Sequence, residues 1–237
     1  MKEKGIGRWL FVAAVLASGL SCAQENPTSG AMAELRLHLV ASQSGKARVV
    51  PAVIWLEPLQ GTAALPFVPH EHYTLLQKNR TFIPHLQVVP VGSVVQFPNA
   101  DPFFHNVFSL FDGKRFDLGL YEAGSSKSVT FSREGVSYIF CNIHPEMSAV
   151  VLALSTPLYA IADASDSFHL HGIPPGDYEL HFWIEGVPQP ALTALDRPLH
   201  FAGHAVDLGE IKAPVSGIRT HKNKFGEAYP PATPSSY

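Results

Sequence analysis

Short runs in which apolar and polar residues alternate recur along the chain, and this two-residue period is typical of half-buried β-strands. Residues 34–40 place Leu35, Leu37 and Leu39 on one face of the first run, and residues 49–58 form a second run that ends at a proline. The runs are short, prolines are frequent, and no run of this kind resembles an amphipathic helix. The pattern therefore predicts an all-β protein.

Further strand-like runs divide the rest of the chain into two groups. One group lies within residues 73–155, and the other lies within residues 157–211, where a Pro-Pro-Gly turn at residues 174–176 separates two of the runs. Residues 24–32 are small and polar, which indicates a linker. Residues 213–237 are rich in Pro, Gly and Ser and lack apolar periodicity, so we expect a flexible tail.

Candidate chemistry is concentrated between two of the strand-like runs, where Cys141, His144 and Met147 have the spacing C-x2-H-x2-M. A thiolate and imidazoles with a weak thioether form a ligand set typical of copper, and His105 is the candidate for the second imidazole. Each residue alone has an ordinary interpretation, since a lone Cys or Met is usually part of a core. The chain has only three methionines, however, and zinc would not select a thioether. Asn106 is a candidate for an outer hydrogen bond to the Cys141 loop.

At this point the sequence resembles the small cupredoxins, over about residues 73–155. The resemblance rests on Phe82-Ile83-Pro84, residues 91–99, His105-Asn106 and the segment 138–147, whose short ligand loop is most similar to that of amicyanins. It implies a Greek-key β-sandwich with one type 1 (blue) copper per chain. By the same resemblance His144 would be the partly exposed ligand. The implied ligands are His105, Cys141, His144 and Met147.

Residues 157–211 resemble a different family, the carboxypeptidase-regulatory-like (transthyretin-like) β-sandwiches. The resemblance rests on residues 167–184, where a strand precedes the Pro-Pro-Gly turn and a Y-x-L strand follows it. Residues 34–58 are similar to the early strands of that module. Neither flank has enough strands to close a core alone. We therefore predict that residues 34–58 and 157–211 form one sandwich, with the cupredoxin-like residues 73–155 inserted between them.

Two H-x-H pairs, His70 with His72 and His169 with His171, offer an alternative metal chemistry because such pairs project from one face of a strand. Multicopper oxidases use pairs of this kind in a trinuclear cluster. In those enzymes histidines flank the copper-binding Cys, and in copper nitrite reductases a His directly follows it. Here the neighbours of the Cys are Phe and Asn. We expect His169 and His171 to be an ordinary outward-facing pair, and we expect no enzymatic activity.

Residues 1–23 have the features of a secretory signal: basic residues, then a short apolar stretch, then small residues. Cleavage after Ala23 would leave Cys141 as the only thiol, and lipidation at Cys22 is the alternative. An unpaired Cys is unusual in an oxidising compartment, and metal binding would explain it. Removal of residues 1–23 would leave a net charge of about −5, which argues against a nucleic-acid partner.

Together these observations predict a periplasmic or otherwise exported blue-copper protein that carries single electrons. Its partners would be redox proteins such as a periplasmic or membrane-bound cytochrome or dehydrogenase, and it would contact a membrane only if Cys22 is lipidated. The alternative is a non-redox copper-binding protein for scavenging or delivery, with the second sandwich serving assembly or adhesion.

Overall fold

The computed structural model describes residues 31–43, 46–47, 49–69, 72–110, 113–216 and 222–229. The predicted signal at residues 1–23, including Cys22, and His70 of the first H-x-H pair lie outside these residues. Within these residues the all-β prediction is confirmed, with one short helix in addition, α1 (Gln189–Thr193), which begins after a proline. None of the helical structure in the described ranges is long and apolar enough to cross a bilayer.

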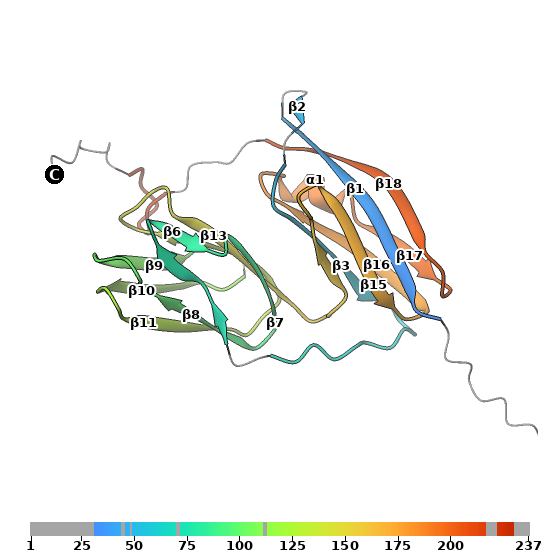
Figure 1. Cartoon of the computed structure of the whole chain (residues 1–237), viewed down its shortest axis with the longest axis horizontal. Helices are drawn as coiled ribbons and strands as arrows, with labels where there is room; N and C mark the ends of the chain where they lie inside the picture. The colour runs from blue at the N-terminus through green and yellow to red at the C-terminus, as the bar shows by residue number, and fades with distance from the viewer. Residues whose placement is uncertain are drawn as a thin grey trace, which may run out of the picture.

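The first and last strands of the described chain build one β-sandwich, which we call the terminal sandwich (Figure 1). In one sheet β1 lies between β15, antiparallel to it, and β18, parallel to it; in the other sheet β3 lies between β14 and β16. Strands from residues 33–58 therefore pair with strands from residues 159–214. Its strands are β1 (Ala33–Gln43), β2 (Lys46–Ala47), β3 (Ala52–Pro58), β14 (Tyr159–Ile161), β15 (Ser167–Ile173), β16 (Gly176–Ile184), β17 (Arg197–Phe201) and β18 (Val206–Pro214).

The middle of the chain forms a second β-sandwich, which we call the site sandwich. A five-stranded sheet in the order β10-β9-β12-β13-β7 faces a three-stranded sheet in the order β11-β8-β4, and β5 pairs with β6 alongside them. The strands are β4 (Tyr73–Thr74), β5 (Leu76–Lys78), β6 (Thr81–Ile83), β7 (Leu86–Pro90), β8 (Ser93–Pro98), β9 (His105–Ser109), β10 (Phe116–Tyr121), β11 (Ser126–Phe131), β12 (Gly135–Cys141) and β13 (Ser148–Leu154).

The alternation seen in the sequence explains which side chains fill the cores. Leu35, Leu37 and Leu39 of β1 are all buried in the terminal sandwich, while the residues between them face outward. Strand β13 differs because both of its faces are covered. Ala149, Val151 and Ala153 pack in the core of the site sandwich, whereas the intervening apolar residues of β13 belong to the core of the terminal sandwich. Continuous apolar sequence is what a strand buried on both faces requires.

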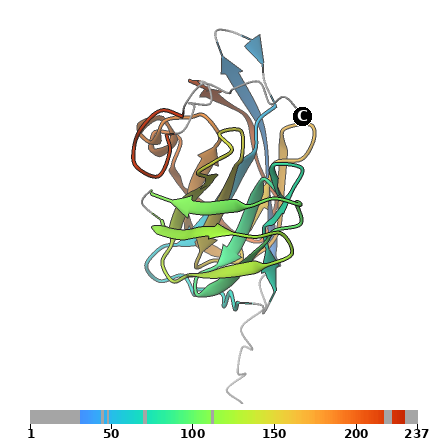
Figure 2. The same ribbon diagram turned by 90° about the vertical axis from the view of Figure 1, so that its left-hand side faces the viewer.

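The two sandwiches lie side by side in Figure 1, and in the view of Figure 2 the site sandwich is in front of the terminal sandwich. Polar contacts also join them. His85 Nε2 lies 2.8 Å from a carboxylate oxygen of Glu185, and His85 Nδ1 lies 3.1 Å from the carbonyl of Ser148, which opens β13. The indole N–H of Trp183 donates to the hydroxyl of Tyr138 over 3.3 Å. These contacts hold the terminal sandwich against the side of the site sandwich that carries β13.

Candidate metal centre

The strands and turns of the site sandwich bring the predicted ligands to one end of it. His105 is the first residue of β9 and Cys141 is the last residue of β12, and these two strands are paired, with Cys141 opposite Val107. A tight loop then connects β12 to β13. Its geometry is fixed by two backbone bonds, from the Met147 N–H to the His144 carbonyl over 3.0 Å and from the Cys141 N–H to the Met147 carbonyl over 3.3 Å.

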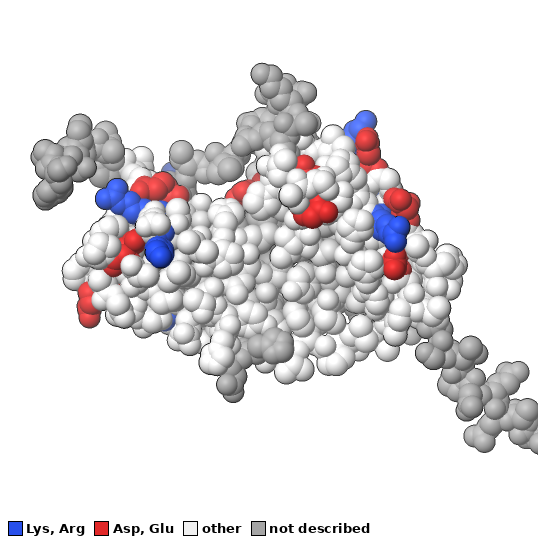
Figure 3. All heavy atoms as spheres, in the orientation of Figure 1, with Lys and Arg blue, Asp and Glu red and all other residues white. Residues whose placement is uncertain are grey.

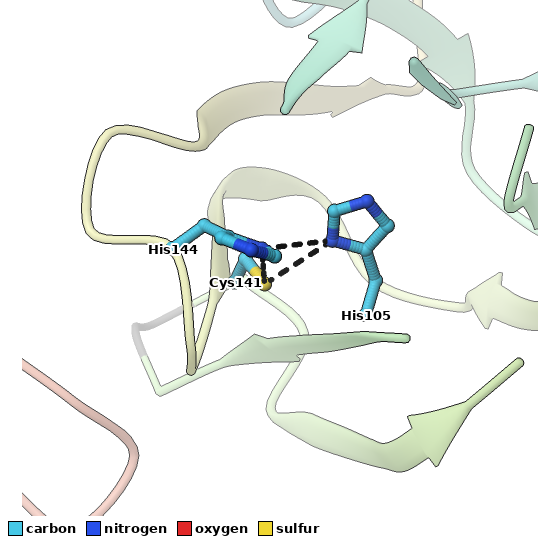
Figure 4. A group of neighbouring side chains, drawn as sticks. All are labelled: His105, Cys141 and His144. Carbon is cyan, nitrogen blue, oxygen red and sulfur yellow. Dashed lines mark hydrogen bonds between the residues drawn. The ribbon is translucent and has the colours of Figure 1, made fainter. Parts of the chain in front are cut away.

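Three donor atoms converge at this end of the sandwich (Figure 4). Cys141 Sγ lies 3.7 Å from His105 Nδ1 and 3.6 Å from His144 Nδ1, and the two Nδ1 atoms are 3.1 Å apart. A triangle with these sides has its centre about 2.0 Å from every corner, close to the ~2.0–2.3 Å at which imidazole nitrogen and thiolate sulfur bind a small divalent metal. The three residues therefore have the geometry of a trigonal metal site with two nitrogen donors and one sulfur donor.

A buried carboxylate fixes the orientation and tautomer of the His105 ring. Asp101 Oδ2 accepts a hydrogen bond from His105 Nε2 over 2.8 Å, and both side chains are almost completely inaccessible. Because Nε2 carries the proton, the Nδ1 lone pair points toward Cys141. Burial acts to raise the pKa of Asp101, but the N–H groups of Asn79 and Arg80 and the His105 ring outweigh it and hold that pKa below its usual value.

Backbone donors also surround the Cys141 sulfur. Burial is the largest influence on the thiol and raises its pKa, while the backbone N–H groups of Asn106, Ile143 and His144 act in the opposite direction. The prediction for Asn106 needs a correction in its detail. The Asn106 side chain donates to Asp117 over 2.7 Å instead of bonding to the Cys141 loop, and its backbone N–H is the group near the sulfur. This follows from the strand pairing, which turns the Asn106 side chain away from Cys141.

Met147 is fully buried within the core of the site sandwich. Its backbone closes the ligand loop on both sides, as described above. Met147 therefore shares the buried core cluster of Cys141, and the role of its thioether as a weak axial ligand stays a prediction.

Aromatic and aliphatic side chains surround the half-buried His144. The ring of Phe103 lies 5.3 Å from the His105 ring and 5.5 Å from the His144 ring, centre to centre. Phe104 and Ile143 are about half exposed nearby in the chain. Burial is the largest influence that lowers the pKa of His144, and a lowered pKa favours the neutral ring that a metal requires.

The remaining H-x-H pair does not form such a centre. Phe168 and Leu170 are buried, and His169 and His171 project outward with their rings stacked 6.5 Å apart, as expected. His171 instead lies 3.2 Å from Glu34. Across the described ranges, the group formed by His105, Cys141 and His144 is the one cluster of three or more His, Cys or acidic residues close enough to hold an ion.

Sequence reasoning missed two parts of the site. Asp101 precedes a proline in a turn-like segment, and nothing in the pattern distinguishes it from an ordinary turn residue. The expected flexible tail also differs from the structure, because Ala213 and Pro214 belong to β18 and residues 222–229 contact the Cys141 loop. These tail contacts are hydrogen bonds between polar side chains and backbone groups, so apolar periodicity in the sequence does not reveal them.

Comparison with known proteins gives matches to solved structures alone. No family model matches the sequence, and no curated protein matches it. A purple cupredoxin from Nitrosopumilus maritimus is 24% identical, with 36% of this chain and 100% of that chain covered and a TM-score of 0.32. Amicyanin from Paracoccus versutus is 21% identical, with coverages of 37% and 85% and a TM-score of 0.32.

A copper-containing nitrite reductase from Thermus scotoductus is 24% identical, with 41% of this chain covered and a TM-score of 0.33; the match spans a quarter of the length of the reductase. The likeness of the terminal sandwich to carboxypeptidase-regulatory-like modules stays a prediction.

Proposed function

We propose that this protein binds one copper ion in a type 1 site and carries single electrons between redox partners. The observation that carries the proposal is the convergence of Cys141 Sγ with the Nδ1 atoms of His105 and His144 on one point, within 3.7 Å of one another. A thiolate with two imidazoles and a thioether nearby is the ligand set of blue-copper electron-transfer sites. Copper bound there would supply a one-electron redox couple.

Contacts within the chain orient these donors. Asp101 and the strand pairing orient His105, and the turn from His144 to Met147 fixes the ligand loop. Donors that are fixed in this way move little when the charge of the ion changes, which suits electron transfer. Zinc would also fit the three donors, but zinc would not select a thioether, so the predicted Met147 ligand favours copper.

The test is to load the exported form of the full chain with Cu(II), dialyse it, and measure metal content, the visible spectrum and a redox titration. We expect one copper per chain, an intense sulfur-to-copper charge-transfer band and reversible one-electron reduction. Three or more coppers with oxygen consumption would indicate an oxidase instead. Tight copper binding without a reversible titration would indicate the scavenging or delivery function.

The proposed partners are redox proteins such as a cytochrome or dehydrogenase, which would dock where the half-buried His144 and the exposed Phe104, Ile143 and Pro145 lie. An apolar rim around one ligand edge allows close approach without strong attraction, as transient complexes require. On the face in Figure 3, acidic and basic side chains are few, the basic ones gather at the two ends beside acidic ones, and no basic stripe for nucleic acid is present there. Export through residues 1–23 and a periplasmic location belong to the same proposal.

A further inference from the structure

A segment from the far end of the chain lies on the metal-ligand loop. Residues 222–229 follow the last strand of the terminal sandwich in sequence, yet they lie at the opposite side of the molecule, beside the site sandwich (Figure 1, red). The Tyr229 hydroxyl donates to the carbonyl of Cys141 over 2.8 Å, and the Lys224 N–H donates to Asn142 Oδ1 over 2.9 Å. Both acceptors belong to the point where β12 ends and the ligand loop begins.

The same segment is also tied to the strand that carries His105. Lys224 Nζ forms an ion pair with Asp117 Oδ2 over 2.7 Å, and Asp117 Oδ1 accepts a hydrogen bond from the Asn106 side chain over 2.7 Å. Asn106 is the residue after His105. A continuous series of polar contacts therefore runs from the Cys141 loop through residues 222–229 to β9.

The segment has a defined turn of its own. Asn223 Oδ1 accepts the N–H groups of Phe225 and Glu227, each over 2.9 Å, and backbone bonds join Asn223 with Gly226 and Glu227. Gly226 has a φ of +82°, a conformation that glycine adopts without strain. A segment that is already folded in this way loses little conformational freedom when it binds the loop.

We propose that residues 222–229 form a strap that positions the two ligand-bearing segments and limits opening of the Cys141 loop. Its consequence for copper, slower release of the ion, rests on the proposed function. Its consequence for the metal-free protein does not, because Cys141 is fully buried and the loop must open before a reagent can reach the sulfur. The strap is a positioning element, since its residues touch the ligand loop and not the donor atoms.

The test compares three forms of the metal-free protein by the rate at which Cys141 reacts with an aromatic disulfide reagent at constant pH. These are the exported form of the chain, which begins at Gln24 and has Cys141 as its only thiol, the variant Tyr229→Phe of that form, and the same form ending at Ser216, which keeps every described strand. One lost net hydrogen bond corresponds to a rate increase of about threefold to tenfold, so we expect that for Tyr229→Phe and more than tenfold for the shortened chain. Tyr178→Phe is the matched control, because its hydroxyl also donates to a backbone carbonyl, in the terminal sandwich.

Equal thiol reaction rates in the unaltered exported form, Tyr229→Phe and the shortened chain would overturn the strap. A second arm measures transfer of copper to a chelator, and we expect the same order of rates. If Cys141 reacts faster in the two altered forms than in the unaltered chain while even the unaltered chain fails to retain copper, that result would support the strap and contradict the proposed copper function. Far-ultraviolet circular dichroism of each variant checks that the β-structure is retained.

Discussion

Two pairs of histidines in this protein have opposite arrangements. His105 and His144 come from different elements, a strand start and a loop, and their Nδ1 atoms face each other at 3.1 Å. His169 and His171 come from one strand, and their rings lie parallel, 6.5 Å apart, on an exposed face. The difference is one of topology: residues two positions apart on a strand point to the same side, whereas residues from separate elements can converge on a point.

The comparison shows that two histidines two positions apart on one strand do not bring their donor atoms together on one point. The H-x-H pair has the more familiar spacing, but its side chains have solvent and Glu34 as partners. The converging pair has an orienting carboxylate and a buried thiol beside it. Orientation by outer contacts therefore separates the two arrangements more clearly than sequence distance does.

The largest effect should come from removing the thiol. We expect Cys141→Ser to lose the sulfur-to-copper charge-transfer band entirely, because no other sulfur ligand of that kind is available in the described chain. The double variant His169→Ala, His171→Ala should keep the band and a copper content of one per chain. Visible spectra and metal analysis after dialysis measure both. Loss of copper from the double variant would show that the comparison is wrong.

Removal of the orienting carboxylate should have the next largest effect. We expect Asp101→Asn to weaken Cu(II) binding by about 10- to 100-fold and to raise the reduction potential, since the buried carboxylate makes the His105 ring a better donor for the more highly charged ion. Competition with a chelator and redox titration measure the two effects. Asp177→Asn is the control, because Asp177 bonds to His200 at the exposed surface of the terminal sandwich over 2.7 Å. Unchanged affinity in Asp101→Asn would leave Asp101 with a structural role only.

A change at Met147 should affect the potential more than binding. The thioether is the weak member of the predicted ligand set, and an amide oxygen in its place favours the oxidised ion. We therefore expect Met147→Gln to keep one copper and to lower the reduction potential. A redox titration beside the unmodified protein measures this. If the variant instead loses its copper, Met147 is required for copper binding, through the ion itself or through the shape of the loop, and is more than a weak axial ligand.

The smallest effect concerns His181, a histidine away from the candidate site that affects only the free energy of unfolding. The carboxylates of Glu57, 3.6 Å from His181 Nε2, and of Asp196, 3.1 Å from His181 Nδ1, raise the pKa of His181 to about 9, although burial opposes them. Because the folded-state pKa is raised, the stabilisation is complete below about pH 6.5 and is lost as the pH rises through 9, on the order of 2 kcal/mol after screening. Denaturant unfolding between pH 6 and 10 measures it. His181→Gln should flatten this dependence, and an unchanged slope would contradict the assignment.

Much of the fold follows from apolar periodicity, and the reason is visible in β1 and β13. The alternating leucines of β1 have one buried face, and the continuous apolar run of β13 has two. Periodicity indicates that a face of a strand is buried, but it does not identify the element that covers that face. The contact between β13 and the terminal sandwich therefore could not be predicted from the sequence. The helix α1 was missed because five residues are too few to show a 3.6-residue period.

The candidate site was predictable as far as it depends on rare residue types at fixed spacing. Cys141, His144 and Met147 belong to one tight loop, so residues that are close in the sequence are also close in the structure. Asp101, Lys224 and Tyr229 act through hydrogen bonds set by the fold, and Asp, Lys and Tyr are common at surfaces in any case. Such outer contacts depend on the tertiary arrangement, which periodicity does not report.

The two-sided burial of β13 also has a consequence for the order in which the chain folds. Every described strand that pairs within the site sandwich lies between residues 73 and 154. Strand β1 pairs early only with the two-residue β2, and the other partners of β1 and all partners of β3 lie after residue 158 in the sequence. We therefore expect the site sandwich to fold first, with Val150, Leu152 and Leu154 exposed on its outer surface. These three side chains would then form the apolar surface on which β1 and β3 assemble with the later strands β14 to β18.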